Sequence, residues 1–207
     1  MNNPRLWTAV SENKFATVCH WLEAHTENLQ EKGGADHSTA LQLAVTARRS
    51  PDMVEKLLSH SPWRIDVNEL FNGQTLLHEV MLDPNMPLAE LLLKYGANTE
   101  KEDSLGETPL HAAATVAEGE FFVLLLLDWR ANINARKTRD NLRGATPLIL
   151  AAFHGITDMV ILLVNKDADI SLQDQWGRTA EEVARQHNYT AIRDYLGKKR
   201  KAREQIG

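Results

Sequence analysis

A short helix-start motif recurs along the chain at nearly constant intervals. Five threonines, the first four of them at the start of an apolar segment, are separated by 36, 33, 38 and 33 residues: Thr39, Thr75, Thr108, Thr146 and Thr179. The most complete copy begins at Gly106 and reads GETPLHAAA. A threonine hydroxyl can cap a helix by accepting a first-turn N–H, and proline is favoured at the first helical position. A motif recurring at such a period predicts a stack of similar helical repeats.

The second half of each repeat is an apolar block about sixteen residues after the threonine. Four such blocks are evident: Val54-Leu57-Leu58, Leu91-Leu92-Leu93, Leu124 to Leu127 and Val160-Leu162-Leu163. They predict a second helix in each repeat. The run from Phe121 to Leu127 is apolar all round, which is typical of a helix buried between neighbours. Leu125→Ala is therefore expected to destabilise the fold by about 2–5 kcal/mol.

This pattern resembles the ankyrin-repeat family. The signature Thr-Pro-Leu-His-x-Ala is complete from Thr108 to Ala113 and partial in the other copies. The resemblance implies an all-α solenoid of helix-turn-helix pairs with short β-hairpin fingers between them. It predicts one domain over residues 1–197, followed by a basic tail at 198–207. Six repeats are expected, with degenerate repeats at both ends, at about 1–37, 38–72, 73–105, 106–143, 144–176 and 177–197.

Nothing in the sequence predicts an active site. His78 and His111 occupy the same motif position, where a histidine bonding to its own helix turn is the simplest interpretation. Consecutive carboxylates at Glu102–Asp103 and Glu181–Glu182 are expected to be solvated. The chain has no phosphate-binding glycine loop and no zinc-binding His-Glu-x-x-His motif. We therefore expect no catalytic residue, no cofactor, no metal site and no enzymatic activity.

The resemblance implies a scaffold that binds another protein through its concave face and finger loops. Exposed aromatic residues are frequent anchors of interfaces, although each could instead cover an adjacent loop. The candidate contact residues occupy finger positions and first-helix positions: Phe71, Leu82, Asp83, Leu105, Val116, Phe153, His154 and Trp176.

Two basic segments suggest an alternative function, the binding of nucleic acid or an anionic surface. The first is a finger with Arg136, Lys137, Arg139 and Arg143, which could grip an acidic partner or be a tolerated insertion. The second contains Lys198, Lys199, Arg200 and Lys201, which could be a nuclear import signal, an anionic-surface contact or an extension of the last helix. The net charge of −5 argues against nucleic acid as the partner.

The sequence also bears on compartment and assembly. Cys19 is the only cysteine, the first residues lack the apolar core of a signal peptide, and the longest apolar run is too short to cross a membrane. These features predict an intracellular protein, cytoplasmic and, if the basic segment is an import signal, nuclear. We expect a monomer.

Overall fold

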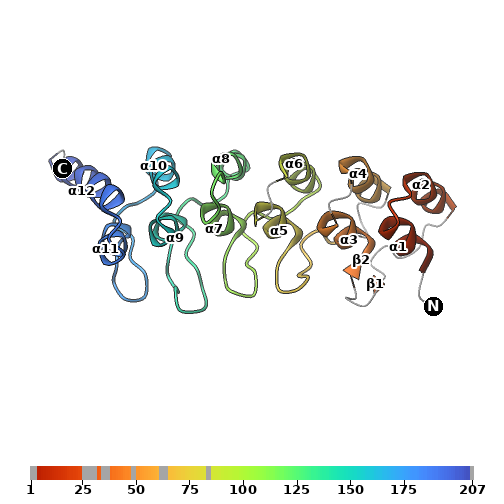
Figure 1. Ribbon diagram of the computed structural model, residues 1–207, viewed down its shortest axis with the longest axis horizontal. Helices are drawn as coiled ribbons and strands as arrows, with labels where there is room; N and C mark the ends of the chain where they lie inside the picture. The colour runs from red at the N-terminus through yellow and green to blue at the C-terminus, as the bar shows by residue number, and fades with distance from the viewer. Residues whose placement is uncertain are drawn as a thin grey trace. The chain divides into compact units, whose positions relative to one another are not determined.

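The structure is a computed structural model that describes residues 4–24, 32–33, 38–47, 50–60, 65–82 and 85–205. The chain divides into two compact units, Met1–Asn98 and Thr99–Gly207, and each is described by itself. In the described part of both units, helices follow one another in pairs (Figure 1). This all-α arrangement confirms the predicted fold class, whereas the division into six repeats stays a prediction.

The N-terminal unit contains six helices and one small hairpin among its described residues. The helices are α1 (Pro4–Ser11), α2 (Phe15–Ala24), α3 (Ala40–Thr46), α4 (Pro51–His60), α5 (Leu76–Leu82) and α6 (Met86–Lys94). Strands β1 (Lys32–Gly33) and β2 (Ser38–Thr39) pair antiparallel, with Lys32 opposite Thr39. The first helix of each pair packs against its second helix and against the next first helix: α1 on α2 and α3, α3 on α4 and α5, α5 on α6.

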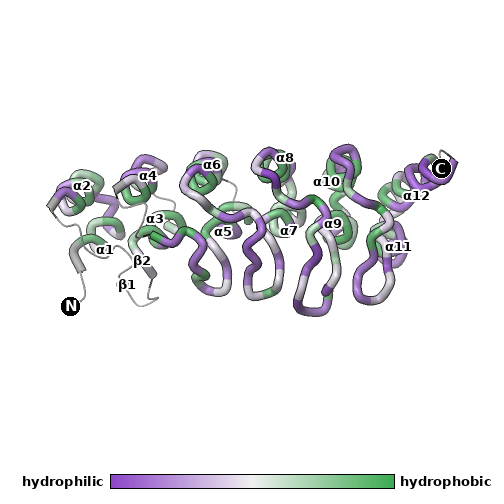
Figure 2. Tube along the Cα trace, turned by 180° about the vertical axis from the view of Figure 1, so that it is seen from behind, coloured by the Kyte–Doolittle hydropathy of each residue, from purple (hydrophilic) through white to green (hydrophobic). Residues whose placement is uncertain are grey.

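The C-terminal unit repeats this packing. Its helices are α7 (Pro109–Ala114), α8 (Glu120–Asp128), α9 (Pro147–His154), α10 (Thr157–Asn165), α11 (Ala180–Gln186) and α12 (Thr190–Glu204). Helix α9 lies between α7 and α11 and also contacts α10. The hydrophobic residues gather in the helices, and the loops before them are largely hydrophilic (Figure 2). The core of the unit therefore lies between the helices, and the loops are left to make other contacts.

The threonines of the motif start the first helices, as predicted. Helices begin directly after Thr39, Thr75, Thr108, Thr146 and Thr179. The backbone of Thr108 is extended, and its N–H donates to Nδ1 of His111 at 3.1 Å. Nε2 of the same ring lies 3.2 Å from the carbonyl oxygen of Ala145, in the next repeat. His111 thus closes a helix cap and joins two repeats through one buried ring.

The apolar run of α8 is not buried all round, so that prediction is wrong. Phe122, Val123 and Leu126 are buried, but Leu125 is only half-buried and Phe121 is 69% exposed. A second helix packs on its first helix through one face, so its opposite face stays accessible. Leu126 is the fully buried leucine, whereas the sequence suggested Leu125.

Candidate protein-binding site

Three fingers precede the first helices of the C-terminal unit and lie side by side. We call residues 101–108 finger A, 136–146 finger B and 173–179 finger C; they lead into α7, α9 and α11. The backbone N–H of Thr138 in finger B donates to the carbonyl of Gly106 in finger A at 3.1 Å. The N–H of Gln175 in finger C donates to the carbonyl of Arg143 in finger B at 2.9 Å. These bonds fix the three fingers as one surface.

Buried aspartates shape fingers A and C. Oδ1 of Asp103 accepts the N–H groups of Leu105 (2.8 Å) and Glu107 (2.9 Å). Oδ1 of Asp174 accepts those of Trp176 (2.9 Å) and Arg178 (3.0 Å). A carboxylate that accepts two nearby N–H groups stabilises a tight turn. Each turn is also closed by a backbone bond across the finger, from the Asp103 N–H to the Glu107 carbonyl (2.9 Å) and from the Asp174 N–H to the Arg178 carbonyl (3.0 Å).

The expectation that the paired acids are solvated is wrong at both sites. Asp103 is 3% exposed because its carboxylate serves the turn of finger A. The Glu181 side chain is 13% exposed and pairs with Arg185 and Arg200, each at 3.0 Å. Glu182 caps its own helix by accepting the N–H of Thr179 at 2.7 Å. These carboxylates are bonded to nearby backbone N–H groups or to arginines instead of to water. Two consecutive acidic residues in a sequence do not reveal such bonds.

The finger tips present an apolar, a cationic and an apolar side chain in turn. Leu105, Arg143 and Trp176 each lie three residues before a capping threonine, and a glycine with positive φ follows each of them. Leu105 is 47% exposed, Trp176 is 53% exposed, and Arg143 is also exposed. We call these three residues the tip row. The Trp176 ring lies 4.5 Å from the guanidinium of Arg178, which itself pairs with Asp174, so the indole is held in place.

Two of the four predicted finger cations are held by other groups. Lys137 is 3% exposed; its ammonium lies 2.6 Å from Glu107 and 3.4 Å from Asp140. The prediction that Lys137 offers its charge to a partner is therefore wrong, because that charge is buried between two carboxylates. Arg136 donates to the carbonyl of Gln173 at 2.6 Å. Arg139 and Arg143 are exposed.

A second cluster lies where α9 and α11 end. Phe153 is half-buried and meets the rings of His154 (centroids 5.3 Å apart) and His187 (4.8 Å) edge to face. Tyr189 stacks on His187 at 5.9 Å. Sequence reasoning missed His187 and Tyr189, although His154 and His187 both lie eight residues after a capping threonine. Val116, just after α7, is half-buried.

The candidates of the N-terminal unit are more dispersed. Phe71 is half-buried and exchanges backbone hydrogen bonds with Gln74 (2.7 and 3.0 Å) around an Asn72-Gly73 turn. Leu82 ends α5 and is 43% exposed. Asp83 lies outside the residues that the structure describes.

The basic segment at the C-terminus is helical. Lys198, Lys199, Arg200 and Lys201 belong to α12, which runs to Glu204, past the predicted domain end at residue 197. Lys199 lies over the ring of Tyr195 at 5.4 Å. The helix-extension alternative is thus the one that the structure shows, and the import signal stays a prediction.

The buried histidines hold helix starts. His111 is fully buried, and burial lowers its pKa below the ordinary value of 6.5 while the Ala145 carbonyl opposes the shift. His78 sits 2.8 Å from the hydroxyl of Thr75. Among the described residues, no group of three or more His, Cys, Asp and Glu side chains could hold a metal ion, and no helix is long and apolar enough to cross a membrane.

Comparison with known proteins agrees with this geometry. A family model described as three copies of ankyrin repeats matches residues 47–137 and 116–205. Neurogenic locus notch homolog protein 1 of Xenopus laevis is 34% identical over 108 residues, which are 52% of this chain and 4% of that protein. Neurogenic locus Notch protein of Drosophila melanogaster is 41% identical over 98 residues, 47% of this chain and 4% of that protein.

The match to these relatives therefore spans only a small part of their length. The family model, in contrast, covers well over half of the chain. Together with the capped helix pairs and the finger turns, it identifies the protein's architecture. The chain belongs to the ankyrin-repeat family.

Proposed function

We propose that the protein is a non-catalytic scaffold that binds a partner protein through the tip row and the neighbouring ends of the first helices. Ankyrin repeats are generally protein–protein interaction modules. The observation that carries the proposal is the tip row, in which Leu105, Arg143 and Trp176 are exposed on three fingers joined by backbone bonds. Rigid aromatic and arginine side chains are the residues that most often dominate binding energy.

The tip row favours a particular kind of partner segment. An apolar side chain at each end and a guanidinium between them complement a segment with an acidic residue flanked by apolar ones. Arg139, exposed on the same finger as Arg143, adds to the positive charge. We expect the protein to act inside the cell, where its single cysteine would stay reduced, and to act there as a monomer.

Affinity capture from a cell lysate, followed by mass spectrometry, tests the proposal. The Leu105→Ala/Trp176→Ala variant should lose partners that the wild type retains, with at least tenfold weaker affinity for each purified partner. Phe121→Ala/Trp129→Ala removes two exposed apolar side chains of α8 and its C-cap, outside the fingers, and is the matched control. Equal loss in both variants would contradict the proposal.

The alternative function, binding of nucleic acid through finger B and the basic segment, has less support. Lys137 is buried in an ion pair, and Arg136 donates to a carbonyl, so finger B offers Arg139 and Arg143 as its exposed, uncommitted cations. That alternative predicts affinity that falls steeply with salt, whereas a contact anchored by Leu105 and Trp176 changes little.

A further inference from the structure

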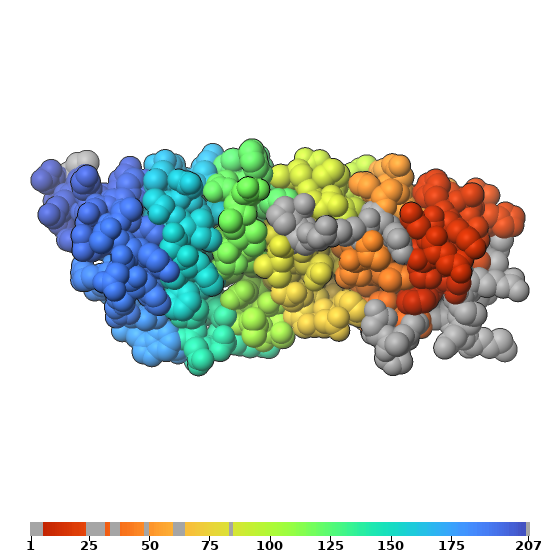
Figure 3. Space-filling view, in the orientation of Figure 1, coloured from red at the N-terminus to blue at the C-terminus, as the bar shows by residue number. Residues whose placement is uncertain are grey.

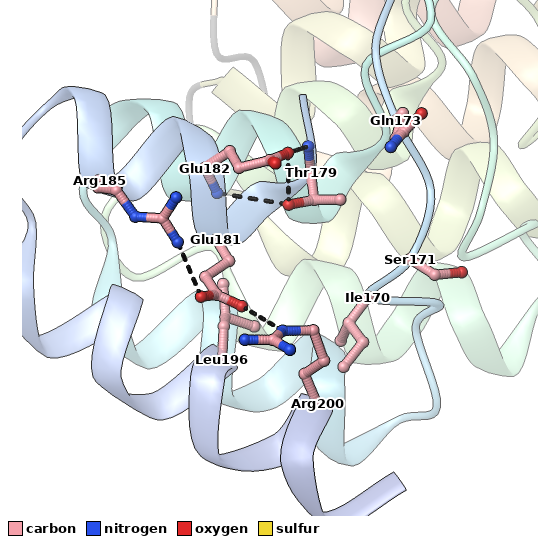
Figure 4. A pocket seen from close by; sticks show the side chains of 9 residues that line it. All are labelled: Ile170, Ser171, Gln173, Thr179, Glu181, Glu182, Arg185, Leu196 and Arg200. Carbon is pink, nitrogen blue, oxygen red and sulfur yellow. Dashed lines mark hydrogen bonds and ion pairs between the residues drawn. The ribbon is translucent and has the colours of Figure 1, made fainter. Parts of the chain in front are cut away.

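Two neighbouring cavities lie beside α11 and α12, and both are lined by Glu181, Arg185 and Arg200. The smaller has a volume of about 370 Å³ and is drawn in Figure 4, where the two guanidinium groups flank the carboxylate of Glu181. The larger, about 530 Å³, we call the basic pocket. Small-molecule sites usually fall within about 300–1,000 Å³, so the basic pocket has room for a ligand. Helices α11 and α12 lie on the surface of the molecule, at the blue end of Figure 3.

Positive charge dominates the basic pocket. Five cationic side chains line it, from two helices: Arg185, Arg193, Lys198, Arg200 and Lys201. Two carboxylates, Glu181 and Asp194, also line it, which leaves an excess of three positive charges. Glu204, bonded to Arg200 at 3.0 Å, lowers that excess to two. The pocket is thus cationic in a chain whose net charge is −5.

The lysines are the cations that no acid neutralises. Arg185 and Arg200 share Glu181, and Arg193 pairs with Asp194 at 2.7 Å. Within the described part of the chain, no ion pair joins Lys198 or Lys201 to a carboxylate. Stabilisation of the helix dipole does not account for Lys198, because that effect is confined to the last turn of a helix and α12 ends at Glu204.

A glycine keeps one wall of the pocket open. Gly197 lies in the middle of α12, where glycine costs about 1 kcal/mol relative to alanine. A Cβ there would lie 3.5 Å from Oε1 of Glu181, an ordinary contact, so helix packing does not require glycine. Lys201 lies one turn on from Gly197 on the same helix face, Lys198 follows Gly197 directly, and both lysines line the pocket. The missing side chain leaves this wall of the pocket open.

We propose that the basic pocket binds a compact, soluble polyanion that carries two or more phosphoryl groups. Arginine guanidinium groups bind phosphate through paired N–H donors, and lysine binds it as a point charge. The excess of at least two positive charges matches more than one phosphoryl group. The residues that line the pocket include no aromatic ring on which a nucleic-acid base could stack, which favours a small polyanion over single-stranded nucleic acid.

Isothermal titration with inorganic tripolyphosphate, using the whole chain near 100 mM salt, tests the proposal. The wild type should bind it saturably, at least tenfold tighter than orthophosphate. Lys198→Gln/Lys201→Gln should weaken binding at least tenfold. Arg130→Gln/Lys166→Gln makes the same change in net charge at exposed positions of the same unit and should bind within twofold of the wild type.

Substitutions of Gly197 that place a side chain in the pocket provide a second, independent test. Gly197→Leu should abolish tripolyphosphate binding, whereas Gly197→Ala should keep it, and circular dichroism should show both variants folded. Three results would overturn the proposal: no saturable binding by the wild type, equal weakening in the two double variants, or tighter binding of a single-stranded oligonucleotide than of tripolyphosphate. Partner capture through the tip row involves none of these residues, so each proposal can fail alone.

Discussion

Lys137 in finger B places its ammonium 2.6 Å from a carboxylate oxygen of Glu107 in finger A, and the lysine side chain is only 3% exposed. The pair joins two fingers whose backbones are already hydrogen-bonded through Thr138 and Gly106. An ion pair this buried depends on its partners remaining together, because either charge alone is poorly solvated. The geometry of the finger surface therefore depends on a residue that the sequence presents as one of several surface cations.

Removing the lysine charge should destabilise the fold. Lys137→Met is expected to cost about 3 kcal/mol, since the glutamate then loses the ammonium that opposes it. Lys137→Met/Glu107→Gln should cost less than the sum of the single variants, with a coupling energy of about 1–3 kcal/mol. Urea unfolding followed by circular dichroism measures all three. Arg139→Met, at an exposed position, should change stability by no more than about 0.5 kcal/mol; strictly additive costs would show that the pair contributes nothing.

Protonation of His111 should make the fold less stable in acid. Burial lowers the pKa of His111 in the folded chain below the value of about 6.5 that an unfolded chain has. Between those two values the unfolded state binds more protons. The stability contributed by the neutral ring is therefore complete above about pH 6.5, and it is lost as the pH falls toward the folded pKa, by at most about 1.4 kcal/mol per pH unit.

His111→Gln isolates this contribution, because Gln42 fills the same position after Thr39 and closes a capping box there. The free energy of unfolding of the wild type should fall more steeply than that of the variant between about pH 7 and pH 5. His78 is present in both proteins, so it does not affect the difference. Parallel pH profiles would contradict the assignment.

Two adjacent leucines of α8 should differ in their contribution to stability. Leu126 is fully buried, and Leu126→Ala should cost about 2–5 kcal/mol. Leu125 is half-buried, and Leu125→Ala should cost about 1 kcal/mol, since less apolar surface is returned to water. Thermal or urea unfolding distinguishes them. A larger cost at Leu125 would restore the interpretation that the whole run is core.

Much of the fold could be predicted because its signals are local. A threonine followed directly by a proline is a local signal for a helix start, and helices begin after Thr108 and Thr146 as that signal predicts. The tip residues Leu105 and Trp176 were predicted because they stand at positions that resemble the variable contact positions of ankyrin repeats. Whether they contact a partner is a question for the capture experiment.

The sequence by itself determined the helix starts and the family, because the capping motif occupies a few neighbouring positions and recurs at a nearly constant interval. Only the tertiary structure decided which charges are available. Lys137 and Arg139 look alike in the sequence, yet one is buried against Glu107, 30 residues away, and the other is exposed. In the same way, the packing of α12 on α11 places Lys198 and Arg185 in the lining of one pocket. Charges act through space, and packing sets their distances.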